Sequence, residues 1–257
     1  DRCVQAYKNE KPIIVALGGH VIKCGLAPNI IEMMELGVIT GLASNGSVVI
    51  HDYEIAKFGE TSEDVAVALE TGEFGMVKET CDGINRIISS ANKKFGYGEA
   101  IGKVLIEKNA ENNHLSLFAN AYKLGIPFTV HVALGTDIVH QHETADGAAI
   151  GDCSMRDFRI LCNNLIELND GGVFLNFGSA VIMPEVFLKA VTVVRNLGYS
   201  LNNFYTAVFD MNMHYRPRTN IVHRPTLSGG KGYYFIGHHE IMIPLFFQTL
   251  KEKIKNA

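Results

Sequence analysis

The sequence predicts an α/β fold with a Rossmann-like, doubly wound, mostly parallel sheet and helices on both of its faces. Three observations support this prediction. Short apolar segments alternate with amphipathic segments along all 257 residues. Most of the apolar segments run into glycine, which is common where a strand turns into a helix. The length and the hydrophobic fraction of 47% suit one α/β domain that spans residues 1–257.

The predicted strands are short, continuous apolar segments, as expected for strands buried on both faces of a parallel sheet. In chain order they are Pro12–Leu17, Val38–Ala43, Ile126–Leu134, Val173–Phe177, Phe204–Phe209 and Tyr233–Ile236.

Helical periodicity and glycine stop signals predict helices between these strands. They are Ala27–Leu36, a helix opened by Thr61–Asp64, helices broken at Gly96 and Gly98 between Gly75 and Lys108, then Leu115–Leu124, Gly151–Leu168, Val181–Leu197 and Glu240–Lys255. We expect Met211–Gly232 to be one long polar loop, and loops of that length are usually functional or disordered.

The charge balance excludes several partners. A net charge of −4 with scattered Lys and Arg gives no basic surface for nucleic acid. No apolar run approaches the roughly 20 residues that span a bilayer, so we expect no membrane contact. The five cysteines are widely spaced, which is typical of a reduced, cytoplasmic chain. The chain begins at Asp1 rather than Met, which leaves a processed or trimmed start open.

Small and polar residues follow nearly every predicted strand. Because the carboxyl ends of parallel strands meet at one edge of the sheet, we expect these residues to form a ligand-binding rim. Glycine after a strand is also ordinary turn chemistry, and a GxGxxG fingerprint is absent after the first strand. The candidate cofactor-binding residues at this rim are Gly19, Ser44, Asn45, Gly46, Asp52, Glu54, Asp146, Gly147, Gly178, Ser179 and His238.

Three residues are candidates for catalysis: Lys23, His20 and His131. A lysine partly removed from water at a glycine-rich rim can act as a base or form an imine with a carbonyl. The alternative for Lys23 is a surface lysine or a simple anion-binding charge. Asp137 and Asp152 are candidates for substrate binding, and Asp152 could instead cap the helix that follows it.

The ten histidines raise the alternative of a metal-dependent hydrolase. His140 and His142 flank one residue on an extended segment, and His131 and Asp137 are near in sequence. No zinc-ligand spacing fits these positions, so we predict no metal.

At these same loops the chain resembles deoxyhypusine synthase. Ala43–Ser47 stands where that family has a Thr-Thr-Ala-Gly-Gly turn followed by acidic residues, and Gly83-Ile84-Asn85-Arg86 matches a family motif. Asp146–Asp152 is similar to its Asp-Gly-Ser-Leu-Gly-Asp, Gly178-Ser179-Ala180 to its triple glycine, and Gly237–Glu240 to its Ala-Asp-Ala-Ser. The shared order, from about Ile13 to about Phe246, is the specific part.

The resemblance implies the family fold and NAD as the cofactor, and the family transfers an aminobutyl group from spermidine to a lysine. Two departures argue against that reaction here. The family's imine-forming lysine lies a few residues after the triple glycine, where this chain has Ile182-Met183-Pro184. The family's substrate-binding histidine before an Ile-Pro pair is replaced by Gly125.

These observations predict an NAD-dependent, deoxyhypusine synthase-like protein that acts on a small amine or related metabolite. The metal-dependent hydrolase and a non-catalytic nucleotide-binding module remain alternatives. Because the family's active sites lie between subunits, the resemblance also implies a homo-oligomer with a small-molecule substrate.

Overall fold

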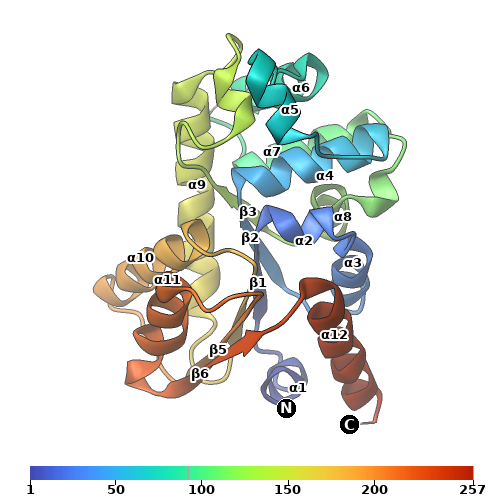
Figure 1. Ribbon diagram of the computed structural model, residues 1–257. Helices are drawn as coiled ribbons and strands as arrows, with labels where there is room; N and C mark the ends of the chain where they lie inside the picture. The colour runs from blue at the N-terminus through green and yellow to red at the C-terminus, as the bar shows by residue number, and fades with distance from the viewer. Residues whose placement is uncertain (92, 257) are drawn as a thin grey trace.

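The computed structural model describes residues 1–91 and 93–256, and their six strands form one parallel sheet in the order β3-β2-β1-β4-β5-β6 (Figure 1). Every neighbouring pair of strands runs parallel. This confirms the predicted Rossmann-like fold class. The strands are β1 (Ile13–Leu17), β2 (Gly41–Asn45), β3 (Phe128–His131), β4 (Val173–Phe177), β5 (Phe204–Asp210) and β6 (Gly230–Ile236).

Alternate side chains of β1 enter two separate hydrophobic clusters, one on each face of the sheet. Ile13, Val15 and Leu17 belong to the first cluster. Ile14 and Ala16 belong to the second. All five residues of β1 are buried, which explains why the strand is a continuous apolar run rather than an alternating one.

Helices cover both faces of the sheet. The first cluster contains residues of α1 (Arg2–Lys8), α2 (Gly19–Lys23), α3 (Ala27–Glu35), α4 (Gly46–Phe58), α6 (Lys78–Ala91), α7 (Tyr97–Glu107), α8 (Leu117–Leu124) and α12 (His239–Lys255). The second contains residues of α10 (Ile182–Asn196) and η3 (Arg218–His223). The long helix α9 (Gly147–Ile166) contributes to both clusters.

The remaining short helices are α5 (Val65–Thr71), α11 (Tyr215–Pro217), η1 (Asn113–Leu115), η2 (Ile138–Gln141) and η4 (Pro225–Ser228). The predicted loop Met211–Gly232 is therefore wrong in part, because it contains α11, η3 and η4. Ile221 and Val222 of η3 are buried against the second face of the sheet. Burial of these two apolar residues explains why this otherwise polar segment folds into short helices against the sheet.

Helix α9 begins at Gly147, four residues before the predicted start at Gly151. The side chain of Asp146 accepts hydrogen bonds from the backbone N–H groups of Ala148 and Ala149, at 2.9 and 3.1 Å. Asp146 is thus the N-cap of α9, and Asp152 lies inside the helix rather than before it.

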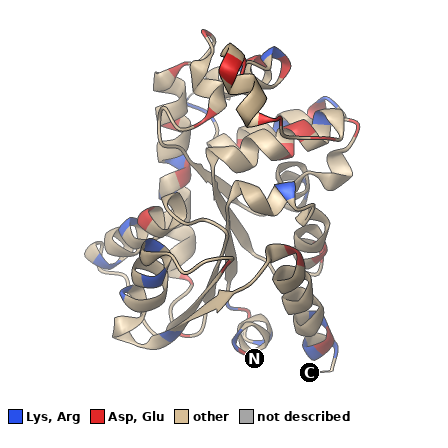
Figure 2. Ribbon diagram, viewed as in Figure 1, with Lys and Arg blue, Asp and Glu red and all other residues tan. Residues whose placement is uncertain are grey.

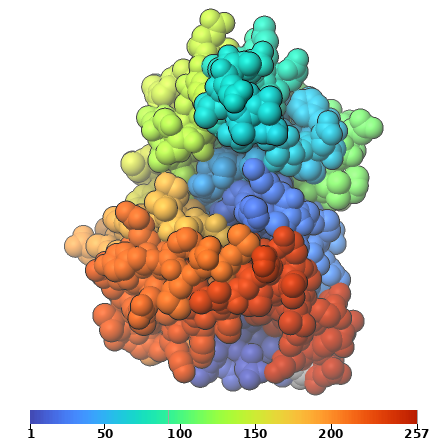
Figure 3. All heavy atoms as spheres, in the orientation of Figure 1, coloured from blue at the N-terminus to red at the C-terminus, as the bar shows by residue number. Residues whose placement is uncertain are grey.

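Charged side chains lie on the helices and loops, while the strands carry almost none (Figure 2). The C-terminal helix lies beside the N-terminal part of the chain (Figure 3). Ion pairs of 2.6 Å join Lys253 to Asp1 and Lys251 to Glu32. Among the described residues, no helix combines the length and apolar character needed to cross a bilayer.

Candidate functional site

Two glycines mark the point where the strand order reverses between β1 and β4. Gly18 follows β1 and donates its N–H to the carbonyl oxygen of Phe177, at 2.9 Å. Gly178 follows β4 with φ +67°, a conformation that favours glycine. A Cβ atom on Gly18 would lie 2.3 Å from the carbonyl oxygen of Gly178. In open parallel sheets, ligands bind at such a switch point, outside the carboxyl ends of the strands.

Two polar side chains from β5 and α12 reach this switch point. Asp210 ends β5 and is buried, with its carboxylate accepting the N–H of Asn212 at 3.2 Å. His239 opens α12, is 2% exposed, and has a buried Nδ1 atom without a hydrogen-bond partner. A Cβ atom on Gly178 would lie 2.8 Å from Nε2 of His239. Burial lowers the pKa of His239 more than the negative charge of Asp210 raises it.

The predicted catalytic residue His20 lies beside this group. Its ring centroid is 6.1 Å from that of His239. Sequence reasoning chose His20 and His238 but not His239 or Asp210. The only signal for Asp210 was its place at the end of a predicted strand, which it shares with many structural residues.

A separate cavity of about 370 Å³ lies between α2, α4 and the segment that follows α4; we call it the α4 cavity. It is lined by Lys23, Ser47, His51, Glu54, Thr61 and Asp137, among others. Helix α2 joins the two regions, since His20 faces the switch point and Lys23 faces the α4 cavity. The structure therefore brings together the predicted residues Lys23, Glu54 and Asp137.

Gly19 and Gly46 are required by the packing around this cavity. A Cβ atom on Gly19 would lie 2.6 Å from Oγ of Ser47. A Cβ atom on Gly46 would lie 2.0 Å from a carboxylate oxygen of Asp137. Burial raises the pKa of Asp137 to about 6. This carboxylate thus lies beside the first residue of α4, at the end of a helix that favours negative charge.

His131 lies apart from His20 and Lys23, on the other face of the sheet. Its ring makes an edge contact with Phe158 of α9, at 6.4 Å between centroids. It also lines a cavity of about 380 Å³ between β3, α9 and α10. Burial lowers the pKa of His131 to about 3, so the ring is neutral. The predicted pairing of His131 with Lys23 is therefore not found.

Several predicted ligand-binding carboxylates have structural partners instead. Asp52 has no exposed surface and accepts hydrogen bonds from Oγ of Ser116 (2.5 Å) and from the N–H of Leu117 (2.6 Å), at the start of α8. Asp152 accepts the N–H of Lys93 at 2.9 Å. With Asp146 capping α9 beside Gly147, none of these groups lines the α4 cavity.

Three further rim positions carry short polar side chains that are bonded locally or buried. Ser179 accepts the N–H of Met183 at 3.2 Å, which satisfies the start of α10. Asn45 accepts the hydroxyl of Ser47 at 3.0 Å. Ser44 is buried in β2, and its Oγ atom has no partner among the described residues.

The histidines do not converge on a metal site. Nδ1 of His140 accepts the backbone N–H groups of Gly135 (3.1 Å) and Asp137 (3.2 Å), so this nitrogen is not free to bind an ion. Across the part of the chain that the structure describes, no three His, Cys, Asp or Glu side chains are arranged to hold a metal. This geometry does not favour the hydrolase alternative.

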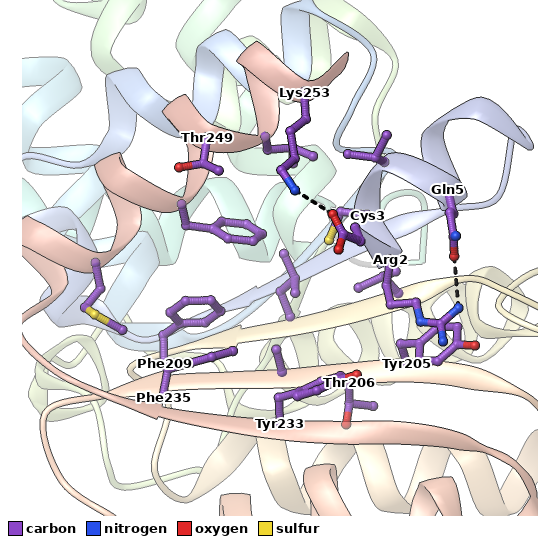
Figure 4. Close-up of a pocket in the computed structure, with 18 of the residues that line it drawn as sticks. Arg2, Cys3, Gln5, Tyr205, Thr206, Phe209, Tyr233, Phe235, Thr249 and Lys253 are labelled. Atoms are coloured by element: carbon purple, nitrogen blue, oxygen red, sulfur yellow. Dashed lines mark hydrogen bonds and ion pairs between the residues drawn. The ribbon is translucent and has the colours of Figure 1, made fainter. Parts of the chain in front are cut away.

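Another cavity, of about 760 Å³, lies elsewhere, between α1, α12 and one face of β5 and β6 (Figure 4). Its walls are mostly apolar and aromatic, with Tyr205, Phe209, Tyr233 and Phe235 from the two strands. None of the predicted site residues lines it. Its place on the sheet face, rather than at the strand ends, separates it from the rim.

The fold and the switch point define a Rossmann-like α/β protein with polar side chains at the carboxyl ends of its strands. No family model matches the chain. It is similar to the deoxyhypusine synthase-like proteins of Chlorobaculum parvum and Chlorobaculum tepidum, with 24% identity to each over 221 residues. These matches cover 77% of this chain and 62% of each relative, so the chain spans less than two thirds of their length. The resemblance to deoxyhypusine synthase-like proteins is thereby confirmed.

Solved structures agree on the fold. A conserved LOR/SDH protein from Methanococcus maripaludis S2 aligns with a TM-score of 0.52 and 19% identity, over 98% of this chain and 65% of that one. AgrE in complex with ornithine and NAD⁺ aligns with a TM-score of 0.57 and 13% identity, over 99% of this chain and 31% of that one. A chain assigned as a deoxyhypusine synthase from Entamoeba histolytica aligns with a TM-score of 0.53 and 11% identity, over 93% of this chain and 74% of that one.

Proposed function

We propose that this protein binds NAD at the β1–β4 switch point and acts on a small amine or related metabolite. The observation that carries the proposal is the reversal of strand order at Gly18 and Gly178, with a partly unsatisfied histidine, His239, beside them. The similarity to AgrE, which was solved with ornithine and NAD⁺, supports both the nucleotide and the amine.

The residues at the switch point fit a dinucleotide. Glycines at positions 18 and 178 let the backbone approach a pyrophosphate closely. Asp210 is a buried carboxylate at the end of β5 and can accept hydrogen bonds from ribose hydroxyls. Because Asp137 already lies against the start of α4, the backbone at Gly18 and Gly178 would hold the phosphates instead of that helix. NAD would supply hydride transfer, and the chain would supply position and proton acceptors.

Lys23 is proposed to contact the substrate, because it lines the α4 cavity one helical turn from His20. The family's imine-forming lysine has no counterpart at Ile182–Pro184. Lys189, further along α10, is exposed and paired with Glu185. We therefore propose a reaction other than deoxyhypusine synthesis. By analogy with the family we also propose a homo-oligomer, which light scattering of the purified protein would test. The five free cysteines are the basis for proposing a cytoplasmic location.

Calorimetric titration with NAD tests this function, after an aliquot has been denatured to check for nucleotide already bound. We expect micromolar binding, and we expect Asp210→Asn to weaken it about tenfold through loss of a charge-assisted hydrogen bond. His223→Gln, at an exposed position on η3, is the matched control and should bind NAD as the wild type does. If neither NAD nor NADP binds and none is carried along, the proposal is wrong.

A further inference from the structure

Three side chains beside the α4 cavity form a hydrogen-bonded chain that the proposed NAD site does not use. Nδ1 of His51 lies 2.8 Å from Oγ1 of Thr61. The hydroxyl of Thr61 in turn donates to Oε2 of Glu54. The other carboxylate oxygen of Glu54 accepts the hydroxyl of Thr80 at 3.0 Å. Glu54 is thus held at both oxygens and fixes the threonine between itself and the histidine.

This chain determines which nitrogen of His51 carries the proton. A threonine hydroxyl has one hydrogen, and that of Thr61 is given to Glu54. The contact between Thr61 and His51 therefore requires His51 to donate from Nδ1. The neutral ring then has its lone pair on Nε2. Without such a partner, neutral histidine is free to carry its proton on either nitrogen.

Nε2 of His51 is the free nitrogen of the ring. His51 lines the α4 cavity, and its Nε2 atom has no hydrogen-bond partner among the described residues and keeps exposed surface. Burial, with the positive charges of Lys23 and His20, lowers the pKa of His51 to about 4. The ring is therefore neutral at physiological pH and presents an acceptor rather than a donor.

The charges around the cavity have both signs. Lys23 contributes the cation. Asp137, Glu60 and Glu63 contribute carboxylates, in addition to Glu54. A cavity whose lining combines a cation, carboxylates and a neutral acceptor is complementary to a small zwitterion.

We propose that the α4 cavity binds a small amino acid, that Nε2 of His51 accepts a hydrogen bond from the amino group of this ligand, and that Thr61 and Glu54 position the ring for it. Lys23 meets the ligand carboxylate. This deepens the proposed function by naming the substrate class, and it rests on that function only in taking an amine as the ligand.

Nitrogen-15 NMR of the histidine rings tests the positioning role without NAD. His51→Gln identifies the His51 signals by their loss. We expect the wild type to show the Nδ1–H form of His51, Thr61→Val to lose that preference, and Thr61→Ser to restore it, because serine keeps the hydroxyl. An Nε2–H form in the wild type, or an unchanged form in Thr61→Val, would overturn the positioning role.

Titration with two matched probes, L-ornithine and its decarboxylated counterpart 1,4-diaminobutane, tests the ligand class. We expect His51→Phe to weaken L-ornithine binding about tenfold, since one hydrogen bond to an ammonium is lost. Lys23→Ala should weaken L-ornithine but not 1,4-diaminobutane, which has no carboxylate. The ligand class is overturned if the wild type does not bind L-ornithine, if His51→Phe binds it normally, or if Lys23→Ala affects both probes equally.

The two proposals fail in different ways. If NAD does not bind but the histidine NMR and the L-ornithine binding are as expected, the nucleotide site is rejected and the amino acid site is retained. Normal NAD binding with an Nε2–H form of His51 would keep the nucleotide and remove the positioning of His51.

Discussion

Gly18 and Gly178 pass each other so closely that a Cβ atom on Gly18 would lie 2.3 Å from the carbonyl oxygen of Gly178 and 3.2 Å from the N–H nitrogen of Ser179. The obstructing atoms are backbone, so no rotation of a side chain can relieve the contact. The loops after β1 and β4, which are far apart in sequence, can therefore approach this closely only because Gly18 has no side chain.

Gly18→Ala should consequently force the two loops apart. We expect the free energy of unfolding to fall by about 1–3 kcal/mol, as in other overpacked sites, with weaker NAD binding in the protein that remains folded. Urea denaturation measures the first effect and calorimetry the second. Gly151→Ala is the matched control. A Cβ atom there meets nothing within 4 Å on the surface of α9, and alanine should stabilise the helix by up to about 1 kcal/mol. Equal stabilities for Gly18→Ala and the wild type would contradict this account of the switch point.

Asp52 was predicted to bind the cofactor, and its partners indicate a structural role that can be measured. Removing the carboxylate in Asp52→Ala leaves the hydroxyl of Ser116 and the N–H of Leu117 buried without an acceptor. We expect a loss of about 3 kcal/mol in the free energy of unfolding. Asp52→Asn keeps one acceptor oxygen and should fold well enough for titration, with NAD affinity equal to that of the wild type within error. A clear loss of affinity in folded Asp52→Asn would restore the cofactor role.

Asp157 makes stability depend on pH in a direction unusual for a carboxylate. It accepts the N–H of Val130 on the edge strand β3 (2.7 Å) and that of Gly98 at the start of α7 (3.0 Å). Burial outweighs these hydrogen bonds and raises the pKa of Asp157 to about 7. The stabilisation is therefore complete below about pH 4, the range of an unfolded Asp, and is lost as the pH rises through 7. Relative to the wild type, Asp157→Asn should therefore gain stability as the pH rises from 4.5 to 7.5, as measured by urea denaturation at both pH values. If the difference in unfolding free energy between the two proteins is the same at both pH values, Asp157 does not titrate in this range.

His131 should make stability depend on pH in the opposite direction, with stability lost as the pH falls. It is buried and neutral, with its pKa lowered to about 3, and Nε2 lies 3.0 Å from Oγ1 of Thr129. Its contribution is complete above about pH 6.5, the pKa in an unfolded chain, and is lost as the pH falls toward 3. The stability advantage of the wild type over His131→Gln should thus shrink from pH 7.5 to pH 5. The same variant should keep NAD binding, because His131 lies on the other face of the sheet from Lys23. Loss of binding in a stable His131→Gln protein would favour its predicted catalytic role.

Most of the fold could be predicted from the sequence because burial on both faces makes each parallel strand a continuous apolar run. Val173–Phe177 was placed at its observed bounds for this reason. The predicted strand Val38–Ala43 begins three residues before β2 and ends two residues before β2 ends, since Val38 and Ile39 are buried in the connection before β2 and have the composition of a strand. Helix α1 was not predicted, because seven residues with two buried side chains give little periodicity.

The candidate site was predicted only as a rim. The sequence by itself determined that polar residues follow the strands, because this depends on local turn chemistry and on the common direction of the strands. Which of those residues meet depended on the tertiary structure. The order of the strands places β1 beside β4, so that His20 lies near His239. The pleat of β3 places the His131 side chain on the opposite face of the sheet. The role of a histidine such as His51 depends on a threonine ten residues away and on where its hydroxyl points, and no spacing along the chain encodes that direction.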